Sequence, residues 1–173
     1  MATMILLPDG SSGHTFHWAA FSGTHEDALG SDDGDTSYVS TSAADRYLTV
    51  TYANPSVAEE DIASIDSVRF LSSGRSTHRT TDSEVDILFM TPLGNPAETV
   101  SYDKHASSYE TINGIARATS DGSAAWTYSN LENLSLRCTK NGSIEVRLSY
   151  LALEVTYTEA VAADNATFFG ANF

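Results

Sequence analysis

Positive charge is scarce in this sequence of 173 residues. Nine Lys and Arg residues stand against 23 Asp and Glu residues, which gives a formal net charge of −14. Proteins that bind nucleic acid need Lys and Arg to neutralise phosphates, and anionic membrane surfaces attract basic segments for the same reason. The composition therefore argues against nucleic-acid and membrane partners and favours a neutral or cationic partner.

Cysteine is nearly absent as well. Cys138 is the only one, so no intramolecular disulfide can form, which fits synthesis in a reducing cytoplasm. The N-terminal segment MATMILLPDG has no basic region, and its apolar stretch is too short for a signal peptide. No window of the sequence reaches the length of a membrane-spanning helix.

The usual sequence signatures of catalysis are also missing. No G-x-S-x-G, HExxH or G-x-x-x-x-G-K motif occurs. Cys138 falls on the apolar face of an expected strand, where a thiol acts as a small hydrophobe and not as a nucleophile. His14 and His17 are three residues apart, so on a strand they would point to opposite faces. We therefore expect no enzyme activity, no cofactor and no metal site.

The acidic run Asp32-Asp33-Gly34-Asp35 is the best candidate for a metal site. Carboxylates spaced along a loop that contains glycine can wrap around calcium. The run lacks the downstream Glu of an EF-hand and the helices that flank one. Asp and Gly are also ordinary residues of tight turns, so a turn is the favoured interpretation and calcium binding the alternative.

Apolar and polar residues alternate along most of the chain, with the period of two that is typical of half-buried antiparallel strands. The clearest predicted strands are Arg46–Tyr52, Ser67–Ser72, Glu84–Met90, Asn133–Lys140 and Ser143–Thr158, and weaker ones are Met4–Leu7, Thr15–Phe21, Thr99–Tyr102 and Glu110–Ala118. Roughly eight to ten short strands at this spacing indicate an all-β fold. We expect an antiparallel β-sandwich that is jelly-roll-like.

Local features refine this expectation. Asn141-Gly142 lies between two alternating runs and predicts a tight hairpin between the last two strands. Within the last strand the apolar positions shift by one residue, which predicts a β-bulge near Tyr150–Leu151 or burial of both faces. Single helical turns are expected at Ser56–Asp61 and Ser129–Asn133.

Aromatic residues are the remaining candidates for ligand contact, because they can stack on sugars. The set comprises Tyr38, Tyr47, Tyr52, Tyr102, Tyr109, Trp126, Tyr128, Tyr150 and Tyr157. Most of them fall at inward positions of strands, so we expect them to lie in the core. Trp18 and Trp126 each lie near a loop, so the sequence pattern assigns them neither to the core nor to a surface that contacts a ligand.

Two stretches resemble a known group of proteins. The first is DDGDTSYVSTSAADRYLTVTY, residues 32–52, and the second is DGSAAWTYSNLENLSLRCTKNGSIEVRLSYLALEVTYT, residues 121–158. Both are similar to segments of small β-sandwich structural proteins of tailed bacteriophages, found among capsid decoration and tail-associated proteins. The resemblance covers roughly a third of the chain and transfers no active-site residue.

The resemblance implies a virion component made in the host cytoplasm. Its expected function is that of a capsid decoration (cement) protein on the outer capsid surface. Its expected partners are the major capsid protein and further copies of itself, as a homo-oligomer, for example a trimer. The alternative is a tail- or fibre-associated module that binds glycans, which needs two or three aromatic side chains exposed along one face. Decoration needs instead an apolar surface at a terminus or a sheet edge.

The chain is predicted to divide into a β-sandwich domain, residues 1–158, and a C-terminal tail, residues 159–173. The tail carries Phe168, Phe169 and Phe173. Aromatic side chains are typical anchors of protein interfaces, so we predict that these three dock on a neighbouring subunit or on the capsid shell. Folding of the tail back over its own sandwich is the alternative.

Deletion of residues 166–173 is therefore expected to spare folding while weakening self-association or binding to particles. Circular dichroism and sedimentation of the truncated and full-length chains measure the two effects separately. A truncated chain that assembles as well as the full chain would show that the tail is not an anchor.

Overall fold

The computed structural model describes residues 1–78, 80–90, 98–103, 108–120 and 122–161. Phe168, Phe169 and Phe173 lie outside the described residues. The strands are β1 Ala2–Leu6, β2 Pro8–Gly13, β3 Ala19–Ala20, β4 Val39–Thr41, β5 Tyr47–Tyr52, β6 Ile62–Ser76, β7 Ser83–Met90, β8 Glu98–Tyr102, β9 Glu110–Asn113, β10 Ser135–Asn141 and β11 Val146–Glu159. The helical segments are α1 His25–Leu29, η1 Gly34–Thr36, η2 Glu59–Asp61 and α2 Tyr128–Glu132.

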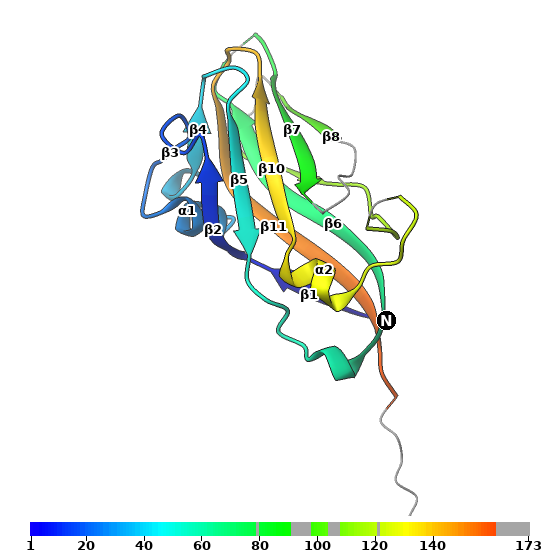
Figure 1. Ribbon diagram of the computed structural model, residues 1–173. Coiled ribbons are helices and arrows are strands. Elements are labelled where there is room, and N and C mark those ends of the chain that lie inside the picture. Colours follow the sequence, from blue (N-terminus) through cyan, green and yellow to red (C-terminus); the bar gives the residue numbers. More distant parts are fainter. Residues whose placement is uncertain (79, 91–97, 104–107, 121, 162–173) are drawn as a thin grey trace, which may run out of the picture.

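Two antiparallel sheets pack face to face as a β-sandwich, as the alternation predicts (Figure 1). One sheet has the order β3-β4-β11-β6-β9. The sixth strand of this sheet, β1, pairs with the second half of β11, on the same edge of β11 that pairs with β4 in its first half. The other sheet has the order β2-β5-β10-β7-β8. The chain passes repeatedly from one sheet to the other, which gives the jelly-roll-like topology. No helix within the described residues has the length and apolar character that crossing a bilayer requires.

The core lies between the sheets and follows the inward positions of the strands. Val68 and Phe70 of β6 and Leu151, Leu153 and Val155 of β11 have no exposed surface. They face the equally buried side chains of the other sheet, which are Leu48, Val50, Val85, Ile87, Phe89, Leu136 and Cys138. Trp18 and Trp126 are also buried, and each indole N–H donates to a backbone carbonyl, at Arg46 (3.3 Å) and Arg117 (2.8 Å).

The predicted β-bulge in β11 is confirmed. The pairing of β11 with β6 shifts between Leu148 and Tyr150, so Ser149 is the extra residue. Because of this extra residue the inward side chains change from Val146 and Leu148 to Leu151 and its successors. Arg147 and Tyr150 consequently both face away from the core.

The predicted hairpin at Asn141-Gly142 is wrong. β10 pairs with β5 on one side and with β7 on the other, so neither edge is free for β11. The turn, with Gly142 at φ +66°, carries the chain from one sheet to the other. Lys140 closes this end of the sandwich: its side chain is buried and its ammonium donates to the carbonyls of Asn141 and Gly142.

Three further expectations change in the structure. The predicted strand Thr15–Phe21 is mostly a turn, in which the N–H of His17 donates to the carbonyl of His14 (2.9 Å), and only Ala19–Ala20 is strand. Glu110–Ala118 is strand only to Asn113. Helix α1 was not expected, although Thr24 and Asp27 have the spacing of a capping box and form one.

Cys138 is fully buried, and burial raises the pKa of its thiol to about 12. Because the thiolate is the reactive form, we expect no labelling by a thiol reagent at pH 8 until the protein unfolds. Protein in denaturant serves as the positive control. Cys138→Ser should lower the free energy of unfolding by about 1–3 kcal/mol, since it places a polar hydroxyl at a fully buried position of the core. Rapid labelling of the native protein would contradict this placement.

Candidate ligand-binding face

Two arginines face each other on the outer surface of the six-stranded sheet. Arg75 of β6 and Arg147 of β11 are paired directly across the two strands. Both occupy outward positions, because their neighbours Gly74 and Ser76 on β6, and Val146 and Leu148 on β11, face the core. Like charges directly opposite each other destabilise a sheet, so this pair requires a negative charge close by.

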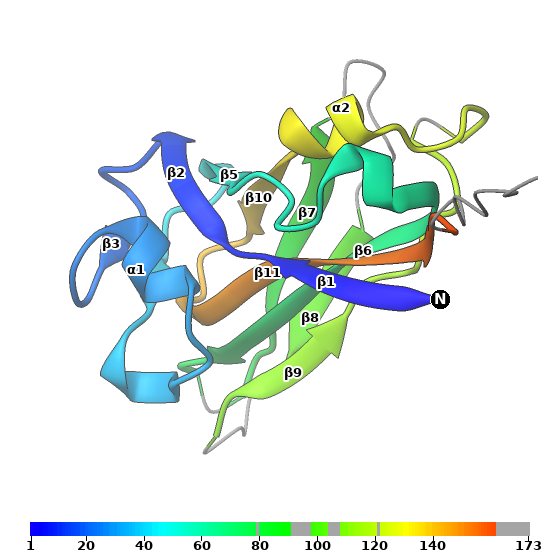
Figure 2. The same ribbon diagram turned by 90° about the horizontal axis from the view of Figure 1, so that it is seen from below.

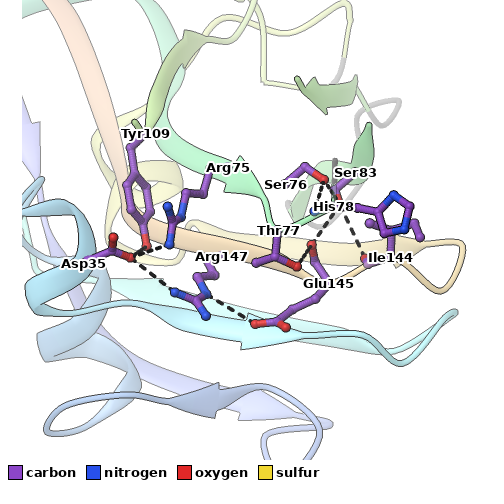
Figure 3. Close-up of polar contacts among 10 residues, drawn as sticks. All are labelled: Asp35, Arg75, Ser76, Thr77, His78, Ser83, Tyr109, Ile144, Glu145 and Arg147. Atoms are coloured by element: carbon purple, nitrogen blue, oxygen red, sulfur yellow. Dashed lines mark hydrogen bonds and ion pairs between the residues drawn. The ribbon is translucent and has the colours of Figure 1, made fainter. Parts of the chain in front are cut away.

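Asp35 supplies that charge (Figure 3). Its Oδ1 lies 2.8 Å from Nη2 of Arg75 and 3.3 Å from Nη1 of Arg147, and the hydroxyl of Tyr109 also donates to it (3.3 Å). Burial and the neighbouring Asp35 carboxylate raise the pKa of Tyr109, which keeps the phenol protonated as a donor. One oxygen therefore joins two strands and the segment that precedes β9.

Glu145 completes the charge balance. Its Oε1 lies 3.3 Å from Nε of Arg147. Its backbone carbonyl is fixed by the hydroxyl of Ser83 (2.9 Å) and the N–H of Thr77 (3.2 Å), as Figure 3 shows. Burial opposes the charged form of Arg147, but the bonds to Glu145 and Asp35 outweigh it and raise its pKa. The four linked charges of Asp35, Glu145 and the two arginines cancel.

Aromatic rings extend the cluster on both sides. The guanidinium of Arg75 lies 5.3 Å from the ring centre of Tyr109, and that of Arg147 lies 4.6 Å from the ring centre of Tyr38. Tyr38 in turn stacks on Phe21, with ring centres 4.7 Å apart and an interplanar angle of 7°. Phe21 is 62% exposed. We call these six residues the aromatic–arginine row: Phe21, Tyr38, Arg147, Asp35, Arg75 and Tyr109.

The acidic run takes the form of a turn, and its three carboxylates have separate partners. Asp33 accepts from the N–H (3.0 Å) and the hydroxyl (2.8 Å) of Ser37, Asp32 accepts from the hydroxyl of Ser149 (3.4 Å), and Asp35 binds the arginines. Gly34 has φ +66°, a conformation that favours glycine. Within the part of the chain that the structure describes, no group of three His, Cys, Asp or Glu side chains is placed to hold a metal ion.

The other sequence candidates lie elsewhere. Of the aromatic set, Tyr38, Tyr52, Tyr102, Trp126 and Tyr157 are buried, and Tyr47, Tyr109, Tyr128 and Tyr150 are half-buried. His14 and His17 do not point to opposite faces, because they lie in a turn and their ring centres are 6.2 Å apart. Sequence reasoning missed Phe21 and both arginines of the row, since alternation reports which face a residue occupies but not which residues of distant strands meet.

Comparison with known proteins gives only distant similarities. No protein-family model and no curated protein sequence matches the chain. A family 11 carbohydrate-binding module from Clostridium thermocellum, solved with a β-1,3-1,4-mixed-linked tetrasaccharide, is 16% identical over 88% of this chain and 86% of that one, with a TM-score of 0.38. A CBM4 structure is 12% identical over 84% of this chain and 96% of that one, with a TM-score of 0.37.

Replacing Asp35 with Asn removes the negative charge that bonds to both arginines while keeping the shape of the side chain. The side chain of Asp35 is 58% exposed, so we expect a loss of about 1 kcal/mol in the free energy of unfolding, as for partly exposed charged pairs. Asp66→Asn is the matched control, because Asp66 accepts from the hydroxyls of Ser64 and Thr158 and forms no ion pair within the described residues. Urea unfolding at low salt measures the free energy of unfolding of both variants. Equal losses in the two variants would show that Asp35 does not hold the arginines together.

Proposed function

We propose that this protein is a non-catalytic β-sandwich module that binds neutral glycans on the outer face of its six-stranded sheet. The observation that carries the proposal is the aromatic–arginine row, in which an exposed Phe21 ring continues into a charge-balanced group of arginines and carboxylates.

The chemistry of sugars fits this arrangement. The C–H face of a pyranose ring is apolar and packs on the negative face of an aromatic ring, which Phe21 presents to solvent. Sugar hydroxyls both donate and accept hydrogen bonds. The guanidinium groups of Arg75 and Arg147 offer donors, and the carboxylate of Asp35 offers acceptors.

The local charge favours a neutral sugar over an acidic one at this face. The positive charges of Arg75 and Arg147 are already matched by Asp35 and Glu145. Asp32 and Asp33 stand in the same turn as Asp35 and add negative charge. A carboxylate or sulfate on the ligand would therefore meet repulsion, whereas hydroxyls would not.

Aromatic side chains on the outward side of this sheet support the glycan alternative. Phe21 is exposed, and Tyr109 and Tyr150 are half-buried on the same outward side of the sheet. Tyr150 is paired with Ser73 of β6, next to the arginine pair. These rings give the face an aromatic surface alongside its polar groups.

Capsid decoration is the second candidate, and a different observation favours it. Met1, Ile5 and Leu7 are exposed on and beside β1, and β1 pairs with β11 alone among the described strands. The start of β1 lies beside the end of β11, since Ala2 pairs with Tyr157 (Figure 1). An apolar surface at a terminus is what attachment to a shell requires. The virion location and the major capsid protein as partner remain predictions, which the truncation of the tail tests.

Phe21→Ala is the direct test of glycan binding. Isothermal titration and affinity electrophoresis with mixed-linkage β-glucan, xylan and galactomannan first identify the neutral polysaccharide that the native protein binds. Phe21→Ala should weaken that binding about tenfold, because an aromatic contact is worth ~0.5–1.5 kcal/mol beyond its buried area. Ile115→Ala, which also removes an exposed apolar side chain, should leave it unchanged. The proposal fails if none of the polysaccharides binds, or if Phe21→Ala binds as the native protein does.

A further inference from the structure

A second group of aromatic and basic side chains lies on the opposite sheet. Tyr47 of β5 faces outward, and its ring centre lies 4.3 Å from that of His14 and 4.6 Å from the guanidinium of Arg137 of β10. Phe16, which is 79% exposed, lies in the same turn and its ring centre is 3.9 Å from that of His17.

The backbone holds this group in place. The N–H of His14 donates to the carbonyl of Tyr47 (2.9 Å), and the N–H of Tyr47 donates to Nδ1 of His14 (3.3 Å). Gly13 has φ +94°, and a Cβ there would lie 2.5 Å from the Tyr47 ring, so only glycine lets the turn approach this closely. The carbonyl of Arg46 accepts from the indole of Trp18 and from the N–H of Lys140, which fixes the start of β5.

The arginines of this group differ from the others in one respect. Arg69, Arg75, Arg117 and Arg147 each pair with a carboxylate. Arg46 and Arg137 form no ion pair with any residue in the described part of the chain, although the sequence holds 23 acidic residues. Nε of Arg137 is buried and makes no hydrogen bond within the described residues, which is also true of Nε of Arg75 and Arg117.

His17 lies in the positive field of Arg46. The pKa of His17 is lowered by partial desolvation and by the nearby charge of Arg46. Arg46 and Arg137 thus carry positive charge that no carboxylate of the described residues balances through an ion pair, on a protein whose net charge is −14. A bound anion would relieve it.

We propose that Arg46, Arg137, Phe16 and the His14–Tyr47 pair form a second ligand site, one that takes an acidic sugar. The face of the Arg137 guanidinium packs on Tyr47 and its Nε is buried, so its two terminal Nη groups are the donors offered to a carboxylate. Phe16 presents an exposed ring to the sugar. This site lies on the outer side of the β5–β10 pair, on the sheet opposite the aromatic–arginine row (Figure 2).

The net charge of the protein sets the conditions under which this binding is measured. A charge of −14 repels an acidic polymer at long range. At about 0.15 M salt charges interact strongly only within roughly 8 Å, so the contacts with the two arginines prevail.

The test compares three probes at that ionic strength: polygalacturonate, neutral dextran and inorganic polyphosphate. The native protein should bind polygalacturonate most tightly. Arg137→Gln and Phe16→Ala should each weaken this binding at least tenfold. Arg46→Gln alters an exposed side chain, so it reports on the site with little effect on folding, and it should weaken binding about threefold or more.

Arg69→Gln is the matched control, because it removes the same charge from the other sheet and should change binding less than twofold. Phe21→Ala should also leave polygalacturonate binding unchanged, so failure at one face is distinguishable from failure at the other. An equal loss in Arg69→Gln and Arg137→Gln would overturn the site, as would the absence of polygalacturonate binding. Polyphosphate bound as tightly as polygalacturonate would overturn the assignment to a sugar.

Discussion

The pairing of β6 with β11 is the constraint on which the rest of the structure depends. These two strands, of 15 and 14 residues, run side by side through the middle of the six-stranded sheet. β11 also carries β1 and β4 on its other edge. Their inward side chains supply much of the core. The same register that buries Val146 opposite Ser76 also places Arg147 opposite Arg75, so the stability of the fold and the charge conflict on its surface have one origin.

Asp35 resolves that conflict from a segment far away in the sequence. The turn at Gly34–Thr36 carries it to the arginines, while Asp33 ties the turn to Ser37 and Asp32 reaches the bulge at Ser149. The acidic run is therefore a connector between the turn and the sheet. Asp35 meets the positive charges of Arg75 and Arg147, whereas Asp32 and Asp33 accept hydrogen bonds from serine hydroxyls.

Much of the fold was predictable because it depends on local pattern. Alternation located the strands around Leu48, Ile87 and Leu136, and the shift in apolar positions located the bulge at Ser149. The partner of each strand was not predictable in this way: Asn141-Gly142 has the composition of a hairpin, but both edges of β10 are occupied by other strands. The candidate site was not predictable either, because Phe21, Asp35, Arg75, Tyr109 and Arg147 come from five separate segments. Phe21 is exposed because the segment before it is mostly a turn, whereas the alternation of apolar and polar residues predicted a strand there.

The central claim is that the outer face around Arg75 and Arg147 binds a neutral glycan. Nuclear magnetic resonance measures this most directly, by titrating the labelled protein with an oligosaccharide of the neutral polysaccharide that it binds. The account predicts that the largest shifts fall on the ring protons of Phe21, Tyr38 and Tyr109 and on the Nε–H signals of Arg75 and Arg147. Shifts that instead concentrate on Tyr47 and Arg137, or that spread without preference over both sheets, would contradict it.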